Sequence, residues 1–201
     1  MSFRKEQKIK LSRSEFLNLK ESLMSRGMDF LYTPRVIKSI YFDTKNLNLF
    51  HDSEEGVLPR KKIRIRSYNN ERKQHKEIKI SSIEGRYKIS ELFSEHENLN
   101  RHFFDKNYGV ISPSLEVSYT REYFSFNKLR ITFDSNIRYI NMRSIVPIEG
   151  YDSECVVEIK TSANSSDDFI KRIIDIPNSR FSKYSRNSSS FKSTTGTLLK
   201  Y

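Results

Sequence analysis

Several segments of the chain alternate between charged and apolar residues, which is the pattern of a β-strand with one polar face. In KIRIR (62–66), three basic residues alternate with two isoleucines. The same alternation recurs in EIK (77–79), RITFD (130–134) and EIK (158–160), and Arg4, Glu6 and Lys8 stand at every second position of RKEQK (4–8). Because the pattern repeats from strand to strand, it predicts a sheet that closes on itself and turns its charged face inward.

The remaining pattern predicts a few short helices beside the strands. The S-R-S-E spacing at Ser12 is a capping box, and it opens a helix that Gly27 can end. A second helix is expected over 94–106, and a third from Ser166 until Pro177 stops it. Strands are expected over 3–11, 36–44, 61–68, 76–80, 114–124, 128–134, 137–140 and 153–160, with a further short strand ending near residue 90.

These elements predict an α+β fold that is mainly β: an antiparallel closed β-barrel of about eight strands with flanking α-helices. We expect a single domain over residues 1–201, with a flexible Ser/Thr-rich tail from about residue 187. A barrel of this size has an interior just wide enough for side chains or one slender ligand. Cations crowded into it repel one another, so we expect carboxylates, water or an anion among them.

The net charge of +11, from 36 Lys+Arg against 25 Asp+Glu, favours an anionic partner. Basic residues alternate with aliphatic ones and not with stacking aromatics, so nucleic acid is not the expected partner. Cys155 is the only cysteine, which excludes an internal disulfide. We find no signal peptide and no transmembrane segment, and expect a cytoplasmic protein; a separate membrane partner and a peripheral position at a membrane stay open.

The triplet Lys62, Arg64 and Arg66 is the strongest candidate site from residue chemistry alone. The guanidinium fork of arginine can bind phosphate oxygens in bidentate fashion, and two arginines at i and i+2 can hold adjacent phosphoryl groups. The alternative is an exposed basic strand face. Motifs of P-loop and dinucleotide-binding proteins, zinc proteases and serine hydrolases are absent from the sequence.

Short motifs in a fixed order resemble a known family. They are R-x-E-x-K (4–8), YFDT (41–44), R-x-R (64–66), E-x-K (77–79), Y-x-R (119–121), R-x-T-x-D (130–134), E-x-K (158–160) and F-S-K-Y (181–184). This order resembles the VTC (vacuolar transporter chaperone) catalytic domain, one of the triphosphate tunnel metalloenzymes, which include the CYTH proteins. The family's antiparallel tunnel agrees with the alternation described above.

The resemblance implies which residues bind phosphate, nucleotide and metal. Phosphate binding is implied for Lys8, Arg64, Arg66, Lys79, Lys88, Arg121, Arg130 and Lys183, and for Arg180, where the family usually has a lysine. Contacts to ATP are implied for Tyr119, Arg64, Arg66 and Lys183. Glu158, with Glu6 as a second acid, is implied to hold a divalent metal, Mn²⁺ or Mg²⁺. Arg4 replaces the first glutamate of the broader family's ExExK pattern, which removes one metal ligand.

The activity that the resemblance implies is that of a polyphosphate polymerase. Such an enzyme transfers the γ-phosphoryl group of ATP to a growing polyphosphate chain inside a basic tunnel, so ATP and polyphosphate are the expected partners. One alternative is an inorganic or nucleoside triphosphatase of the same fold, in which water attacks. Another is a module that binds polyphosphate or nucleotide without turnover. The residues leave these alternatives and the oligomeric state open.

Overall fold

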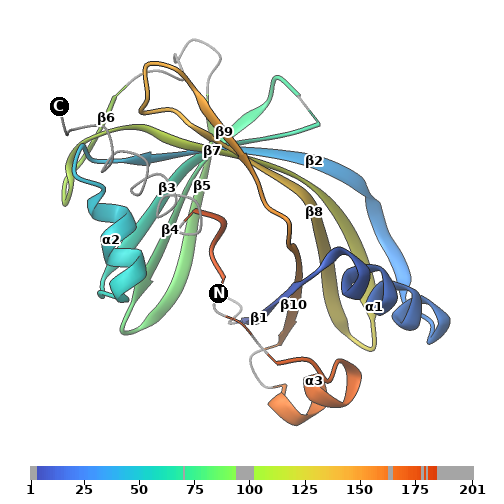
Figure 1. The fold of residues 1–201 in the computed structure, drawn as a ribbon. Helices are drawn as coiled ribbons and strands as arrows, with labels where there is room; N and C mark the ends of the chain where they lie inside the picture. Colours follow the sequence, from blue (N-terminus) through green and yellow to red (C-terminus); the bar gives the residue numbers. More distant parts are fainter. Residues whose placement is uncertain are drawn as a thin grey trace, which may run out of the picture. The chain divides into compact units, whose positions relative to one another are not determined.

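A computed structural model describes residues 4–69, 71–93, 102–162, 165–177, 179 and 181–184. The helices are α1 (Arg13–Ser25), α2 (Asn48–Glu55) and α3 (Asp167–Ile173), and Figure 1 shows their places along the chain. The strands are β1 (Arg4–Leu11), β2 (Asp29–Asp43), β3 (Arg60–Tyr68), β4 (Gln74–Ser82), β5 (Gly85–Phe93), β6 (Phe103–Asp105), β7 (Gly109–Phe126), β8 (Leu129–Asn141), β9 (Ile148–Tyr151) and β10 (Cys155–Ser162). No helix in this part of the chain is long and apolar enough to cross a membrane.

The strands pair in the order β1-β10-β8-β7-β2-β3-β4-β5, with β6 added to β7 and β9 added to β8. The registers of β1 with β10, β10 with β8, and β2 through β5 are antiparallel. The predicted mainly β, antiparallel fold with few helices is therefore confirmed. Its closure is not confirmed: across the described residues, β1 pairs with β10 alone and β5 with β4 alone, so the path of strands ends in an edge strand on each side.

The chain divides into two compact units, through which the long strands β2, β7 and β8 pass in turn. The first unit comprises Met1–Arg35, Tyr119–Ile137 and Asp152–Phe181, and the second Val36–Ser118, Arg138–Tyr151 and Ser182–Tyr201. The single domain expected over residues 1–201 stays a prediction.

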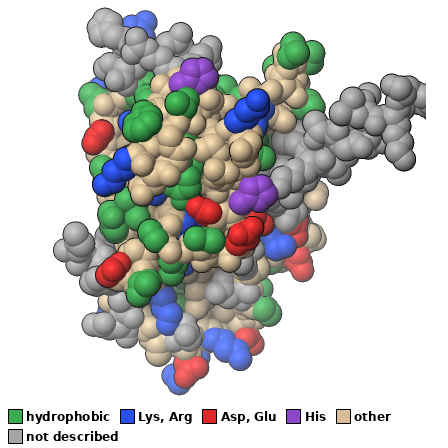
Figure 2. Space-filling model, turned by 90° about the vertical axis from the view of Figure 1, so that its left-hand side faces the viewer, with side chains coloured by type: hydrophobic (Ala, Val, Ile, Leu, Met, Phe, Trp, Pro, Cys, Tyr) green, Lys and Arg blue, Asp and Glu red, His purple; other side chains and the backbone are tan. Residues whose placement is uncertain are grey.

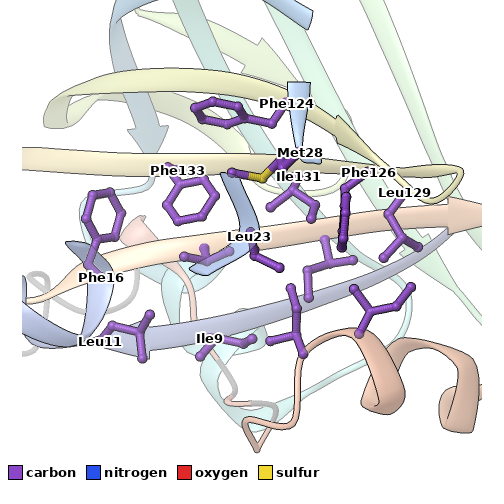
Figure 3. Packing of buried hydrophobic residues seen from close by; sticks show 14 of the residues in the cluster. Ile9, Leu11, Phe16, Leu23, Met28, Phe124, Phe126, Leu129, Ile131 and Phe133 are labelled. Atoms are coloured by element: carbon purple, nitrogen blue, oxygen red, sulfur yellow. The ribbon is translucent and has the colours of Figure 1, made fainter. Parts of the chain in front are cut away.

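The core of the first unit lies between its strands and the helices α1 and α3. The apolar positions of β1, β8 and β10 join residues of β7 and both helices in one buried cluster: Ile9, Leu11, Phe16, Leu23, Met28, Phe124, Phe126, Leu129, Ile131, Phe133, Cys155, Val157, Ile159, Ile170, Ile173 and Ile174. Figure 3 shows most of these side chains, and the ring of Phe16 packs edge to face on Phe133 at 5.1 Å between centroids. Burying each large side chain stabilises the fold by roughly 1.5–3 kcal/mol.

Helix α1 begins as the sequence predicts. The backbone N–H of Ser12 donates to Glu15 Oε2 at 2.8 Å, and the N–H of Glu15 donates to Ser12 Oγ at 3.3 Å. These two bonds are the capping box, which satisfies two N–H groups at the helix end.

The core of the second unit is smaller and packs against α2. It contains Ile40, Phe42, Leu49, Ile63, Ile65, Phe93 and Ile111. No helix was predicted for residues 48–55, but they form α2. The N-terminus of α2 is capped by a residue of the preceding strand. The buried carboxylate of Asp43, on β2, accepts hydrogen bonds from the backbone N–H groups of Leu49 at 2.9 Å and Phe50 at 3.0 Å. No Ser or Asp precedes the helix at the usual capping position, so the sequence carries no start signal there.

Two further expectations differ from the structure. Residues 128–134 and 137–140 were expected to be separate strands but belong to the single strand β8, because Asn136 takes a left-handed conformation (φ 53°) without ending the pairing. Of the helix expected over 94–106, residues 94–101 lie outside the described residues, and 103–105 form the strand β6.

Candidate functional site

In the first unit, the charged strand residues share one face of the sheet. Lys8 is paired with Glu158, and Glu6 with Lys160. Both pairs extend across the sheet to β8, because Glu158 is also paired with Thr132, and Lys160 with Arg130. The residues between them, such as Ile9, Ile131 and Val157, belong to the buried core. Successive strand side chains point to opposite faces, so the charged face lies opposite the core, as the alternation predicts.

Glu158 lies in a network of buried charges on this face. Lys160 Nζ is 2.7 Å from Glu158 Oε1, and Arg121 Nη2 is 3.6 Å from Glu158 Oε2. Arg121 also donates from Nε and Nη2 to the carboxylate of Asp134, which is 0% exposed. Burial would raise the pKa of Glu158, but Arg121, Lys160 and Lys8 hold that pKa well below its usual range. Glu158 is therefore ionised.

The other predicted residues of the first unit lie around this network. Lys8 Nζ is 3.3 Å from Glu6 Oε1 and donates to the carbonyl oxygen of Phe181 at 3.3 Å. The guanidinium carbon of Arg121 is 5.3 Å from the ring centroid of Tyr119, which is buried. Arg180 lies outside the described residues.

In the second unit, the predicted arginines meet a single carboxylate. Arg64 Nε donates to Glu77 Oε2 at 2.8 Å, and Arg66 Nη1 lies 3.8 Å from the same oxygen. Lys88 Nζ donates to Glu77 Oε1 at 2.9 Å. Burial would raise the pKa of Glu77, but Arg64 and Arg66 lower it to about 2. Three cations thus gather on one ionised carboxylate, and both arginines are buried.

Tyr41 adds a phenol to this cluster. Register places Tyr41 beside Arg64, whose Nη1 donates to the phenol oxygen at 3.0 Å. Burial would raise the pKa of Tyr41, but Arg64, Arg66 and Lys62 together lower it to about 7. Tyr41 is consequently the group of this cluster whose charge changes near neutral pH.

Three lysines continue the charged face of the second unit. Lys79 is the register partner of both Lys62 and Lys88, so the three lie in a row across β3, β4 and β5, which are neighbours in Figure 1. Lys79 and Lys88 are exposed, whereas the arginines in the next rows are buried. On the side of the molecule where α2 lies, Lys and Arg are scattered among hydrophobic and acidic side chains (Figure 2).

The segment that carries Lys183 is held in the second unit by its neighbours. Lys62 Nζ donates to Ser182 Oγ at 2.8 Å. The ring of Tyr184 stacks on Tyr41 at 4.8 Å between centroids, and its hydroxyl donates to Asp43 Oδ2. Lys183 therefore lies in a segment anchored on both sides.

The predicted metal ligands fit a cation that arrives with a phosphate ligand better than one bound by the protein alone. Within the described ranges, no group of three or more His, Cys, Asp or Glu side chains could hold a metal ion. Both oxygens of Glu158 already lie near cations, and Glu6 is near Lys8. Mg²⁺ in phosphate-binding proteins is commonly held by one or two carboxylates plus the phosphate oxygens, and Glu158 and Glu6 can supply that number.

Sequence reasoning missed four residues of these clusters as site residues: Tyr41, Glu77, Asp134 and Lys160. Glu77, Asp134 and Lys160 each share strand parity with a predicted residue, so alternation was the available signal for these three. Tyr41 lies on β2, which carries no predicted site residue. Asp134 lies in R-x-T-x-D, and Glu77 and Lys160 lie in the two E-x-K motifs. The ion pairs of Glu77, Asp134 and Lys160 depend on strand register, which cannot be derived from the motifs. In each unit the structure brings the predicted residues onto one face: Lys8, Glu6, Tyr119, Arg121, Arg130 and Glu158 in the first, and Arg64, Arg66, Lys79 and Lys88 in the second.

Comparisons with known proteins identify the family. Among solved structures, a candidate adenylate cyclase from Bacillus halodurans has a TM-score of 0.61 at 16% identity, covering 90% of this chain and 94% of that chain. A candidate adenylyl cyclase from Hippeastrum, described as having a dominant triphosphatase activity, has a TM-score of 0.54 at 18% identity and covers 98% of each chain. At these identities the likeness concerns the fold.

The search of curated proteins gives no match for this chain. The family model of the VTC domain, in contrast, matches residues 3–192, which is nearly the whole sequence. This match confirms the resemblance carried by the short motifs, and the chain belongs to the VTC domain family.

Proposed function

We propose that this protein is a polyphosphate polymerase of the triphosphate tunnel type. The observation that carries the proposal is the gathering of Arg64, Arg66 and Lys88 on the single carboxylate of Glu77. Two arginines at i and i+2 on one strand face suit adjacent phosphoryl groups, and their burial strengthens each charge-assisted hydrogen bond. Membership in the VTC family supports the same ligand.

In the proposed reaction, a terminal oxygen of the polyphosphate chain attacks the γ-phosphorus of ATP. The bond between that phosphorus and the β–γ bridging oxygen breaks, and ADP leaves. No general base is required, because the attacking phosphate oxygen is already anionic near neutral pH. The protein aligns the two phosphates and balances the charge on the transferring oxygens, which is the main source of rate in phosphoryl transfer.

The predicted residues divide into two groups for this task. Arg64, Arg66, Lys79, Lys88 and Lys183 would bind phosphate in the second unit, and Lys8, Arg121 and Arg130 would do so in the first. Arg180 is a further predicted phosphate ligand. Tyr119 would line the nucleotide end. Glu158 and Glu6 would hold Mn²⁺ or Mg²⁺ brought in with the phosphates, and the ion would neutralise phosphate charge and polarise the phosphoryl oxygens.

A triphosphatase is the second candidate function. The similarity to the Hippeastrum protein, described as having a dominant triphosphatase activity, favours it. The same phosphate-binding groups serve when water replaces the polyphosphate end as the nucleophile. Binding of polyphosphate or nucleotide without turnover is the outcome if neither reaction occurs.

One experiment separates these candidates. The purified protein is incubated with ATP and Mn²⁺, and the products are resolved by gel electrophoresis and ³¹P NMR. Long-chain phosphate together with ADP would support the polymerase. Free orthophosphate without chain growth would support the triphosphatase, and unchanged ATP would leave a binding module. Arg66→Ala serves as the loss-of-function control and Lys73→Ala, at an exposed position of the turn before β4, as the matched surface control.

A further inference from the structure

Two tyrosines and two arginines form a separate cluster in the first unit. The rings of Tyr32 on β2 and Tyr123 on β7 pack edge to face, with centroids 5.7 Å apart. The guanidinium carbon of Arg35 is 5.8 Å from both ring centroids. That of Arg130 is 5.9 Å from Tyr32 and 5.6 Å from Tyr123. These four residues are named the Tyr32 cluster.

The two rings of the Tyr32 cluster differ in exposure. Tyr123 is 4% exposed and belongs to the packed interior, whereas Tyr32 is 49% exposed. Packing explains Tyr123, because a buried ring contributes its full apolar area to the fold. It does not explain why Tyr32, which packs against Tyr123 and has two guanidinium groups over its ring, keeps about half of its surface open.

Arg130 supplies a second and independent observation. Its Nε is buried, yet this nitrogen has no hydrogen-bond partner among the described residues. A buried donor without a partner costs roughly 1–3 kcal/mol, which a bound acceptor would offset. Arg130 is also the register partner of Lys160, so the Tyr32 cluster adjoins the charged face that carries Glu158.

We propose that the Tyr32 cluster is a stacking site for the nucleobase of a nucleoside triphosphate. The base lies against the open surface of Tyr32, and Arg130 Nε donates to an acceptor of the nucleotide. Every nucleobase has a π-face, so stacking of this kind discriminates weakly between bases. The inference rests on the proposed function, because the triphosphate of the same nucleotide would bind to cations of the first unit, Lys8, Arg121 and Arg130.

The test compares ligands with and without a base on the full chain. Calorimetric titrations with ATP, GTP and tripolyphosphate are made on the wild-type protein, Tyr32→Ala and Tyr32→Phe. Tyr32→Ala is expected to weaken ATP binding by about tenfold and to leave tripolyphosphate binding unchanged, since base stacking contributes roughly 1–3 kcal/mol. Tyr32→Phe keeps the ring and is expected to bind ATP like the wild type, and GTP is expected to follow ATP.

Tyr151→Ala is the matched control. Tyr151 is also exposed, at 74%, and also lies near a guanidinium group, that of Arg138 at 5.9 Å, but it belongs to the second unit. Its removal is expected to change neither titration.

Three results would contradict a proposal here. If Tyr32→Ala weakens ATP and tripolyphosphate equally, or weakens neither, the stacking site is wrong while the proposed function stands. If wild-type protein binds ATP in a Tyr32-dependent manner but not tripolyphosphate, the phosphate assignment is wrong and the stacking site stands. If it binds neither ligand, both are wrong.

Discussion

Arg121 donates two hydrogen bonds to the carboxylate of Asp134, from Nε to Oδ1 at 2.6 Å and from Nη2 to Oδ2 at 2.7 Å. The same guanidinium lies 3.6 Å from Glu158. An arginine implied to bind phosphate therefore lies between two carboxylates, which balance its charge. Arg121 consequently has a structural role in addition to its proposed role in phosphate binding.

Replacing Arg121 should accordingly destabilise the fold. Arg121→Ala leaves the carboxylate of Asp134 buried without its cation, and breaking a buried pair in this way costs about 3–5 kcal/mol. Urea unfolding of Arg121→Ala, Asp134→Ala and the double variant measures the effect. The double variant is expected to lose much less than the sum of the single losses, because the two residues act on one interaction. Additive losses would show that the pair is not coupled.

Arg66 should matter for phosphate binding, and Lys73 should not. A charge-assisted contact contributes roughly 1.5–3 kcal/mol, so Arg66→Ala is expected to weaken tripolyphosphate binding by at least about tenfold. Lys73 lies at an exposed position of the turn before β4, and Lys73→Ala removes the same charge from the surface. Calorimetric titration of both variants decides the point. Equal, small effects would mean that phosphate is attracted by the whole basic surface.

Glu158 should be needed for turnover more than for binding. Glu158→Gln keeps the size of the side chain and removes the charge proposed to hold the metal. Mn²⁺-dependent turnover of ATP is expected to fall strongly, with ATP binding largely kept because the basic residues remain. Glu122→Gln is the control, since Glu122 pairs with Lys20 in the same unit and is not a residue of the Glu158 network. Undiminished activity of Glu158→Gln would refute the metal assignment.

Tyr41 should make phosphate binding depend on pH. Its pKa of about 7 lies below the usual tyrosine value of about 10, so above pH 7 the phenolate balances part of the charge of Arg64 and Arg66. Tripolyphosphate affinity of the wild type, relative to Tyr41→Phe, is expected to fall as pH rises through about 7. The phenolate absorbance near 295 nm measures the ionisation directly, and loss of the step near pH 7 in Tyr41→Phe would assign it.

The contribution of Tyr41 to the free energy of unfolding should rise with pH, whereas its effect on phosphate affinity should lower that affinity with pH. A group whose pKa is lowered in the folded state stabilises that state where it is ionised. The contribution is complete above about pH 10, where tyrosine also ionises in the unfolded chain, and it is lost as pH falls through about 7. The free energy of unfolding of the wild type, relative to Tyr41→Phe, should therefore rise between pH 7 and 10. A flat difference across this range would contradict the lowered pKa.

The faces of the strands could be predicted from the sequence because strand parity is local. Ile63 and Ile65 lie in the core and Arg64 and Arg66 opposite them, as alternation requires. Closure could not be predicted in the same way, since an open sheet and a barrel have the same alternation. The prediction of a single closed barrel relied on recurrence of the pattern and on the number of strands, and the family resemblance agreed with it.

Interactions between distant residues were beyond the reach of local patterns. Arg64 and Glu77 meet because β3 and β4 take one register, and a slip of one residue would have placed them on opposite faces. Helix α2 was missed because its capping carboxylate, Asp43, lies at the end of β2 and not directly before the helix. The opening of α1 was found because both partners of its capping box lie within four residues.

The pairing of β1 with β10 has a consequence for the order in which the protein folds during synthesis. Strands β2 to β5 pair with neighbours in sequence, so most of their contacts can form early. Among the described strands, β1 is synthesised first and its partner β10 (Cys155–Ser162) last. Until β10 is made, β1 lacks its native pairing partner. The charges of Glu6 and Lys8 are favourable during this interval, because charged side chains on a strand edge hinder its pairing with other chains.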